Sequence, residues 1–256
     1  MKGIFAYMGR STLDLMREMG QIMLLFIEAL YWLFRPPFRI RHFFKQMEFI
    51  GVNSLFVVML TSLFTGMVLA LQTYYAFRMF SAETLVGATV ALSMTRELGP
   101  VITGLMVTGR AGSAICAEIG TMRVTEQVDA LTVMAINPVQ YLVLPRVLAG
   151  FIVLPLLTVI SDVMGILGGY LVGVKVLGIH GGLFMNKIYE FVELGDVYNG
   201  LVKASAFGVI LTLVSCYKGF YTRGGAEGVG RSTTQAVVMS SVLILVSDYI
   251  LTALMF

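Results

Sequence analysis

The chain has 256 residues, of which 57% are hydrophobic and 13% are charged, with a mean hydropathy of +0.86 and a formal net charge of +3. The charged share is about half that of an average soluble domain, so the composition excludes an ordinary water-soluble fold. The modest charge also argues against a nucleic-acid-binding protein, which would carry a basic stripe. The composition predicts an all-α integral membrane protein.

The N-terminal residues differ from the rest of the chain because charges interrupt their apolar runs. Charges recur through residues 4–34, and Glu28 divides the longest apolar stretch there, which predicts an amphipathic helix in the membrane interface. Two prolines, Pro36 and Pro37, end this helix. The residues around them form a basic stretch that suits an anionic cytoplasmic leaflet, namely Arg35, Arg39, Arg41 and Lys45. We therefore separate residues 1–48, an interfacial helix with a basic linker, from residues 49–256, a transmembrane domain.

Five apolar runs of the second part are candidates for membrane-spanning helices, since about 20 residues cross the hydrocarbon core. They lie at about 50–72, 84–115, 140–176, 199–220 and 233–255. The third run is too long for one upright span, which leaves tilt, a kink at Pro155 or an additional helix outside the bilayer as alternatives. A mixed loop is expected at 177–198.

The distribution of basic residues predicts the orientation of these spans. With the N-terminus, residues 116–146 and residues 218–231 placed inside, twelve of the eighteen Lys and Arg residues lie inside and three lie in the opposite loops. Cytoplasmic loops carry an excess of Lys and Arg, so we expect the N-terminus inside and the C-terminus outside.

Glycines mark two further features. A small-xxx-small spacing in the third run predicts close helix packing, within the chain or against a second copy, at Gly165, Gly169 and Gly173. Residues 224–232 approximate a phosphate-binding loop with arginine in place of lysine, but the strand that such a loop follows is missing. We interpret them as a flexible cytoplasmic turn, with Ser232 or Thr233 capping the last span.

Charged residues inside the spans carry the most information. Arg96 and Glu97 are adjacent, and a charge at mid-bilayer costs at least about 2.5–3.5 kcal/mol on insertion scales. Neighbours on a helix do not face each other, so at least one of the two needs a partner elsewhere or a wet cavity. Lys203 is a third intramembrane charge, and a Glu97–Lys203 pair is our hypothesis. Such a pair would line a substrate cavity or act only as an interhelical salt bridge.

The remaining polar residues do not form a catalytic arrangement. Asp162 and Asp248 lie in apolar runs, where they would serve a proton relay or, more commonly, cap a neighbouring backbone group or meet an arginine. The two histidines are isolated, and the two cysteines have neither a disulfide framework nor metal-site spacing. The sequence predicts no catalytic residues, no metal and no cofactor, and a transporter rather than an enzyme.

A polar stretch at 118–131 lies inside by the charge count. Apolar and charged residues alternate along it in an amphipathic pattern, namely Met122, Val128 and Leu131 among Arg123, Glu126 and Asp129. A short charged helix between two spans suits docking onto a soluble partner, although a solvated helix has the same pattern.

Three segments resemble one known family. ELGPVITGLMVTGRAGSAICAEIGTMRVTEQVDAL at 97–131, INPVQYLVLPRVLAG at 136–150 and SSVLILVSDYILTALMF at 240–256 are similar to MlaE-type permeases, also called the YrbE family. The resemblance extends over nearly the whole chain, and the block at 97–150 is the most specific part.

The resemblance implies a function, partners and a location. It implies a homodimeric permease in the bacterial inner membrane, paired with a cytoplasmic ABC ATPase and a periplasmic ring of MCE-domain proteins, often with a STAS-domain subunit. It implies transport of phospholipids between the inner and outer membranes, which maintains the lipid asymmetry of the outer membrane. ATP would then be hydrolysed by the partner.

The resemblance also implies site residues. The charges of the lipid pocket match Arg96, Glu97 and Lys203, and the first span offers an apolar wall near its outer end at Leu69, Leu71, Tyr74 and Phe77. The coupling helix matches residues 118–131, with expected ATPase contacts at Glu118, Arg123, Glu126, Gln127, Asp129 and Leu131. The family often has a second acid where this chain has Gln127.

Other functions compete with this interpretation. A secondary transporter would use a proton or sodium gradient through Glu97, Asp162 and Asp248, and would need no ATPase. A membrane anchor for MCE proteins would tolerate substitution of Glu97 or Lys203 without loss of lipid traffic. An integral-membrane lipid enzyme has the least support, since catalytic groups are lacking.

Overall fold

The computed structural model describes residues 2–33, 35–36 and 40–255, and every regular element within them is helical. Pro37 and Arg39 of the basic linker lie outside the described residues. The α-helices are α1 (Lys2–Leu33), α2 (Ile40–Ile50), α3 (Val52–Arg78), α4 (Val86–Ser93), α5 (Gly99–Val107), α6 (Ser113–Val124), α7 (Gln127–Val133), α8 (Leu144–Tyr170), α9 (Gly181–Phe191), α10 (Leu194–Phe220) and α11 (Gly225–Met255). Four π-helical segments, at Met94–Leu98, Thr108–Gly112, Val139–Val143 and Leu171–Val176, and a 3-10 turn at Glu83–Leu85 join several of them.

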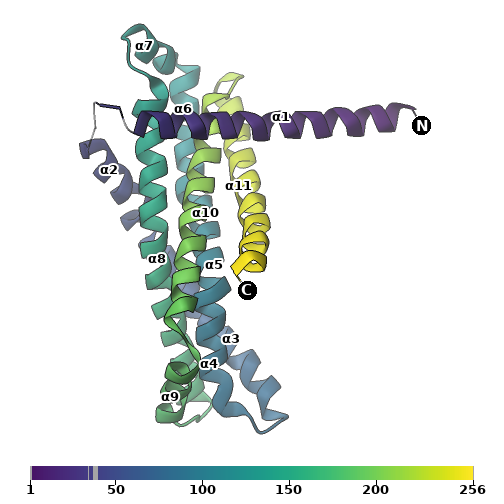
Figure 1. Ribbon diagram of the computed structural model, residues 1–256, viewed down its shortest axis with the longest axis vertical. Coiled ribbons are helices and arrows are strands. Elements are labelled where there is room, and N and C mark those ends of the chain that lie inside the picture. Colours follow the sequence, from purple (N-terminus) through teal and green to yellow (C-terminus); the bar gives the residue numbers. More distant parts are fainter. Residues whose placement is uncertain (1, 34, 37–39, 256) are drawn as a thin grey trace.

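The long helices form an elongated bundle (Figure 1). Four helical stretches of the described chain are long and apolar enough to cross a membrane: Ile40–Arg78, Val139–Val176, Leu194–Phe220 and Gly225–Met255. A fifth rod, built from α4, α5 and α6, runs beside them through the bundle and carries charges along its length. The chain is therefore an all-α, multi-pass membrane protein. The count of five spans and their orientation remain predictions.

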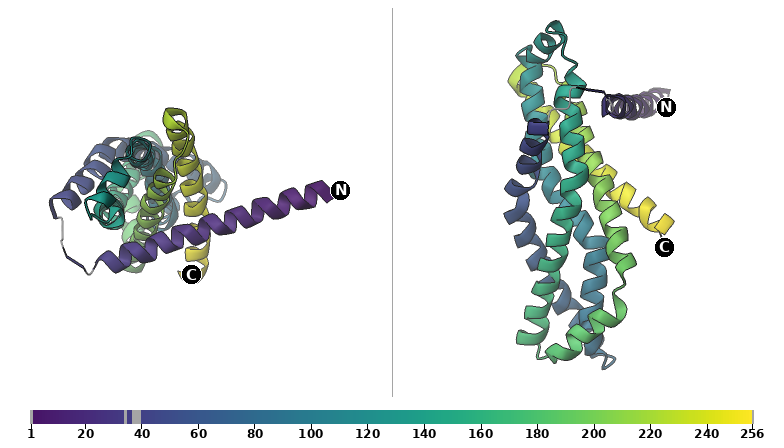
Figure 2. Two further views of the ribbon diagram at one scale, coloured as in Figure 1. Left: turned by 90° about the horizontal axis from the view of Figure 1, so that it is seen from above. Right: turned by 60° about the vertical axis from the view of Figure 1, so that its left-hand side comes forward.

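The two ends of the bundle differ in what they carry. Helix α1 crosses one end, extends well beyond the bundle, and lies across the direction of the long helices (Figures 1 and 2). Helix α7 lies at this same end, and α9 lies at the other. Two polar contacts join α1 to α10, because Tyr217 Oη lies 2.5 Å from Gln21 Oε1 and Lys218 Nζ lies 3.0 Å from the Glu18 carboxylate. The expected N-terminal helix is confirmed, and its place in the membrane interface remains a prediction.

Glycines let the helices approach closely, as the spacing in the third run predicts. A Cβ atom placed on Gly66 of α3 would lie 1.9 Å from the carbonyl oxygen of Gly165 in α8. One placed on Gly208 of α10 would lie 2.2 Å from the carbonyl oxygen of Gly150, also in α8. Any larger residue at these points would collide with backbone, so α8 packs tightly against α3 and α10 within one chain.

The third apolar run and the loop after it differ in part from expectation. Val139–Val176 is one continuous helical stretch that contains Pro155, so the run itself is not divided into two helices. The expected loop at 177–198 instead contains α9, which buries Phe184 and Ile188 against α4 and the end of α3. Helix α9 thus packs its apolar residues onto the other helices at this end of the bundle.

The last span begins earlier than expected. Gly224 and Gly225 have positive φ angles of 94° and 67°, and α11 starts at once, so residues 225–232 are helical rather than a flexible turn. Thr233 lies inside the helix and donates a hydrogen bond to the Val229 carbonyl at 2.7 Å instead of capping the helix. Packing of α11 against α6 and α10 overrides the weak helix propensity of the glycines.

Candidate functional site

A π-helical turn interrupts the rod between α4 and α5 and carries the adjacent charges Arg96 and Glu97. Such turns are rare and occur frequently at functional sites. Pro100 has no N–H to offer the carbonyl of Arg96, four residues before it. The ammonium of Lys203, from α10, donates to that carbonyl at 3.1 Å. The turn is thus tied to a second helix through both its backbone and its side chains.

Lys203 is the centre of a buried polar network. It has no exposed surface, and its Nζ also donates to Glu97 Oε2 at 2.6 Å and to Thr252 Oγ1 at 2.7 Å. Asp248 Oδ1, from α11, lies 3.2 Å from the same nitrogen. The predicted Glu97–Lys203 pair is confirmed, and Asp248 meets Lys203 rather than the expected arginine. Three helical rods of the bundle are joined at this point.

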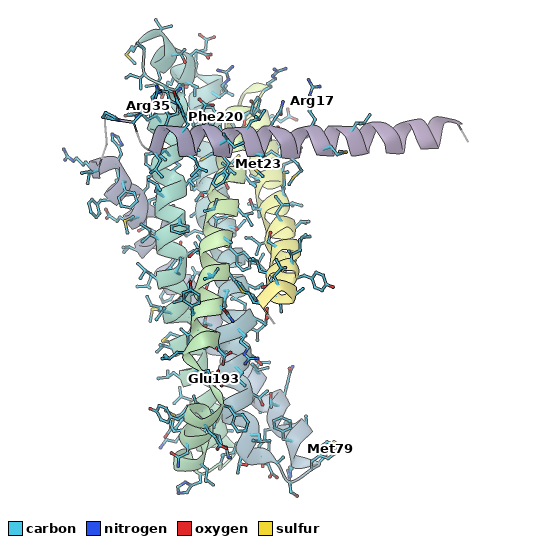
Figure 3. All side chains as sticks on the ribbon, in the orientation of Figure 1. Arg17, Met23, Arg35, Met79, Glu193 and Phe220 are labelled. Atoms are coloured by element: carbon cyan, nitrogen blue, oxygen red, sulfur yellow. The ribbon has the colours of Figure 1, made fainter. Side chains whose placement is uncertain are left out.

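Arg96 extends to a different partner that sequence reasoning missed. Its Nε and Nη2 both lie 2.8 Å from Oδ1 of Asp196, a buried residue in the first turn of α10. Asp196 also accepts the backbone N–H of Glu193 at 3.0 Å, as part of a reciprocal capping box. Figure 3 labels Glu193 at the start of α10 and Phe220 at its other end. The signal was the three-residue spacing from Glu193 to Asp196, within the segment that we expected to be a loop.

Exposure separates the charges that a ligand can reach from those that only support them. The side chains of Glu97 and Arg96 are 36% and 38% exposed, whereas that of Lys203 is fully buried with all three N–H groups engaged. In this arrangement Lys203 holds Glu97 in place, and Arg96 and Glu97 are the exposed charges of the turn. That any of the three contacts a lipid remains a prediction.

An apolar cluster, buried at its centre and partly exposed at its edge, adjoins the charged turn. Met94 and Leu98, on either side of the two charges, belong to an apolar cluster with α4 and α9. Three of the four apolar residues expected on the first span pack against this cluster: Leu69, Tyr74 and Phe77. Leu71 is outside it and 39% exposed. The structure thus brings most of the predicted apolar wall to the turn that carries Arg96 and Glu97.

Asp162 lies beside Gly99, the residue that directly follows the charged turn. Its Oδ1 lies so close to Gly99 that a Cβ there would be 1.8 Å away, and the atom has no hydrogen-bond partner within the described residues. Among the described residues, no side-chain hydrogen bond or ion pair links Asp162 to the Lys203 network. The three acids considered for a proton relay are therefore not joined into one chain of contacts.

The polar stretch at 118–131 is divided rather than forming one helix. Helix α6 ends at Val124, and Glu126 adopts a left-handed φ of 60° before α7 begins. Arg123 and Asp129 form an ion pair across the break. Leu131 is buried against Leu142, so it anchors α7 to the bundle and does not face a partner as expected.

The residues that α7 presents outward are nevertheless mostly those expected. Glu126, Gln127 and Asp129 are exposed at the end of the bundle. Val133 and Met134, which the sequence pattern did not single out, are 87% and 61% exposed beside them. Exposed apolar residues rimmed by charges are typical of protein interaction sites.

Glu118 and Arg146 connect this end to the bundle. Glu118 Oε2 lies 2.8 Å from Arg146 Nη2, and Arg146 also donates to the Leu142 carbonyl at 2.7 Å. Arg146 is 2% exposed, so the pair joins α6 to the start of α8 inside the protein. Glu118 thus has a structural partner within the chain.

The described chain is a multi-pass helical bundle with a partly exposed charged turn and with exposed charges at one end, an arrangement that is compatible with a membrane permease. A family model described as Permease MlaE matches residues 43–254, so the chain belongs to the MlaE permease family. The resemblance found in the sequence is confirmed.

Curated relatives agree with this assignment. The chain is 42% identical to the intermembrane phospholipid transport system permease protein MlaE of Haemophilus influenzae, over 97% of the chain and 96% of that relative. It is 49% identical to a probable ABC transporter permease protein of Rickettsia bellii, with the same coverage. It is also 38% identical to the chloroplastic protein TRIGALACTOSYLDIACYLGLYCEROL 1 of Arabidopsis thaliana, over 93% of the chain and 66% of that protein.

Proposed function

We propose that this chain is the membrane-spanning permease subunit of an ABC system that moves phospholipids between the bacterial inner membrane and a conduit of MCE-domain proteins. Such transport maintains the lipid asymmetry of the outer membrane. The Haemophilus influenzae relative, an intermembrane phospholipid transport system permease protein that is 42% identical over nearly the whole length, supports the lipid as substrate.

The observation that carries the proposal is the charged turn at Arg96 and Glu97. A phospholipid needs an apolar surface for its acyl chains and a few charges for its headgroup. The turn offers a half-exposed guanidinium for a phosphate and a half-exposed carboxylate for a headgroup ammonium, beside the apolar cluster of α4 and α9. Lys203 and Asp248 keep the turn in place without competing for the ligand.

ATP hydrolysis belongs to a partner in this proposal. The exposed residues Glu126, Gln127 and Asp129, with Val133 and Met134, form the docking surface for a cytoplasmic ABC ATPase. Movement of α7 reaches the bundle through the Glu118–Arg146 pair and the buried residues Val128 and Leu131. This end of the bundle is then cytoplasmic, with the N-terminus inside and the C-terminus outside.

The other end of the bundle faces the periplasm in this proposal. It carries α9 and the exposed pair Met79 and Phe80 at the end of α3, which suits contact with a ring of MCE-domain proteins. A second copy of the chain completes the permease, and a STAS-domain subunit joins the ATPase. The complex resides in the inner membrane.

The experiment is ATP hydrolysis by the chain copurified with its ATPase and reconstituted in phospholipid. Asp129→Arg should release the ATPase and abolish lipid-stimulated turnover, because it reverses a charge on the docking surface. Glu190→Arg on α9 is the matched control, since both acids form ion pairs within the chain and their side chains are 59% and 58% exposed. It should leave the ATPase bound.

Each outcome has a distinct meaning. Loss of copurification with Asp129→Arg alone supports the docking surface. Equal turnover in both variants removes Asp129 from the interface. If the wild-type chain binds no ATPase and moves lipid only with an ion gradient, the gradient-driven transporter replaces the proposal. If lipid traffic is insensitive to substitution of Glu97, the membrane anchor does.

A further inference from the structure

A small polar cavity lies between α2 and the start of α8, apart from the charged turn. It has a volume of about 200 Å³, and its lining includes Lys45, Gln46, Glu118, Tyr141 and Arg146. Glu118 follows Glu97 by 21 residues on the same rod, which at 1.5 Å per residue separates the two sites by roughly 30 Å. The cavity is therefore not part of the substrate site proposed above.

Two side chains in its lining have unsatisfied polar atoms. Arg146 Nε and Gln46 Oε1 are both buried and make no hydrogen bond within the described residues. An orphaned buried polar atom costs about 1–3 kcal/mol, so native proteins usually provide it with a partner. The other two guanidinium nitrogens of Arg146 contact Glu118 and the Leu142 carbonyl, so Nε is the one without a partner among the described residues. An unmet guanidinium donor suits an anionic oxygen.

A groove along α2 shares His42 and Lys45 with the cavity and combines charge with apolar surface. The groove is lined by Arg41, His42, Phe44, Lys45 and Glu48. Together the two hollows hold three cations, Arg41, Lys45 and Arg146, against two acids, Glu48 and Glu118. The balance favours an anion.

Exposed apolar side chains follow the same helical stretch away from the groove. Phe44 is 61% exposed, and Val52 and Phe56 on α3 are 65% and 74% exposed. In a membrane these residues face acyl chains, and basic pockets between helices at the cytoplasmic side bind lipid headgroups. A ligand with a phosphate at one end and acyl chains at the other matches both the cavity and this surface.

We propose that the cavity between α2 and α8 binds the phosphate of a phospholipid headgroup from the adjacent leaflet, as a second lipid site distinct from the transport site. Lys45 and Arg146 contact the phosphate, and Gln46 meets a polar group of the headgroup. The bound lipid bridges α2 and the Glu118–Arg146 pair, next to the α6–α7 end. The lipid at this site remains bound and is not transported, so the site does not depend on the proposed transport function.

The test is photo-crosslinking of the full-length chain in vesicles that contain a phosphatidylglycerol with a diazirine in its headgroup. Adducts are mapped to peptides, so labelling at 40–48 and 139–146 is counted apart from labelling near Arg96. Lys45→Gln should lower labelling of these peptides about fivefold, the usual effect of one basic residue at an anionic surface. Arg223→Gln removes an exposed cation at the same end of the bundle and outside the cavity, and should change nothing.

Two further arms identify the ligand. A diacylglycerol probe with the same acyl chains and no phosphate should label these peptides weakly, and excess inorganic phosphate should not compete. Equal labelling by diacylglycerol, or equal labelling of the Lys45→Gln variant and the wild type, overturns the headgroup site. Complete competition by inorganic phosphate assigns the cavity to free phosphate and overturns the lipid. All of these crosslinking measurements are made without ATP or an ATPase, so their outcome is independent of the proposed function.

Discussion

The charged turn in the bundle and the α6–α7 end both carry ion pairs, but the pairs differ in burial. Lys203 is fully buried and contacts a carbonyl, a carboxylate and a hydroxyl, with a second carboxylate 3.2 Å away. Arg123 and Asp129 are 39% and 59% exposed and pair only across a short break. The first arrangement fixes helices relative to one another, and the second leaves its charges available to a partner.

The Arg96–Asp196 pair lies between these two extremes, with one half-exposed and one buried member. The order of burial therefore gives an order of expected stability effects, because burial sets the cost of leaving a charge without its partner. Burial also separates residues that support a site from residues that a ligand touches. Three substitutions, at Lys203, Asp196 and Arg123, test this order.

The largest effect is expected for Lys203→Met. It leaves Glu97 and Asp248 together without their cation, and breaking a buried pair costs about 3–5 kcal/mol. The thermal midpoint of the purified chain in detergent should fall sharply. Lys175→Met, at an exposed position, is the matched control and should have little effect. The triple variant Lys203→Met, Glu97→Gln, Asp248→Asn should recover much of the loss, and a stable single variant would contradict the network.

An intermediate effect is expected for Asp196→Asn. The substitution removes the charge that Arg96 pairs with, and keeps an oxygen that can still accept the N–H of Glu193. Losing a charged hydrogen bond at a buried site costs about 1–3 kcal/mol. The same thermal measurement should place this variant between Lys203→Met and the wild type. A midpoint below that of Lys203→Met would contradict the order of effects that burial predicts.

The smallest effect is expected for Arg123→Gln. Exposed ion pairs contribute less than about 1 kcal/mol, so the midpoint should stay close to that of the wild type. Copurification with the ATPase should respond more than stability does, since Asp129 loses the partner that orients it. A large thermal shift would mean that the break between α6 and α7 depends on this pair.

The pairing of buried charges was predictable from the sequence where the charges lie within long apolar runs. Charges in the second and fourth runs needed partners, and Glu97 and Lys203 were the pair that the sequence suggested. The α-helical class and the close packing at Gly165 followed from composition and spacing in the same way. Segments with weaker patterns were less well predicted, namely α9, the early start of α11 at Gly225, and the break at Glu126.

The missed features depend on contacts between distant parts of the chain. Asp196 lies 100 residues from Arg96, and no local pattern links the two. The burial of Leu131 depends on Leu142, and the full burial of Lys203 depends on α11 as well as on its own helix. A sequence can indicate which charges need partners, but the choice between contact residue and support residue requires the three-dimensional packing.

The central claim is that the exposed charges of the turn contact the transported lipid. The direct test is ATP-driven phospholipid transfer by the reconstituted complex with Glu97→Gln, which keeps an oxygen for the hydrogen bond from Lys203 and removes the half-exposed carboxylate. We expect transfer to fall on the order of tenfold, the usual cost of losing a charged hydrogen bond, with the thermal midpoint and the bound ATPase retained. Unchanged transfer by a folded complex would contradict the claim.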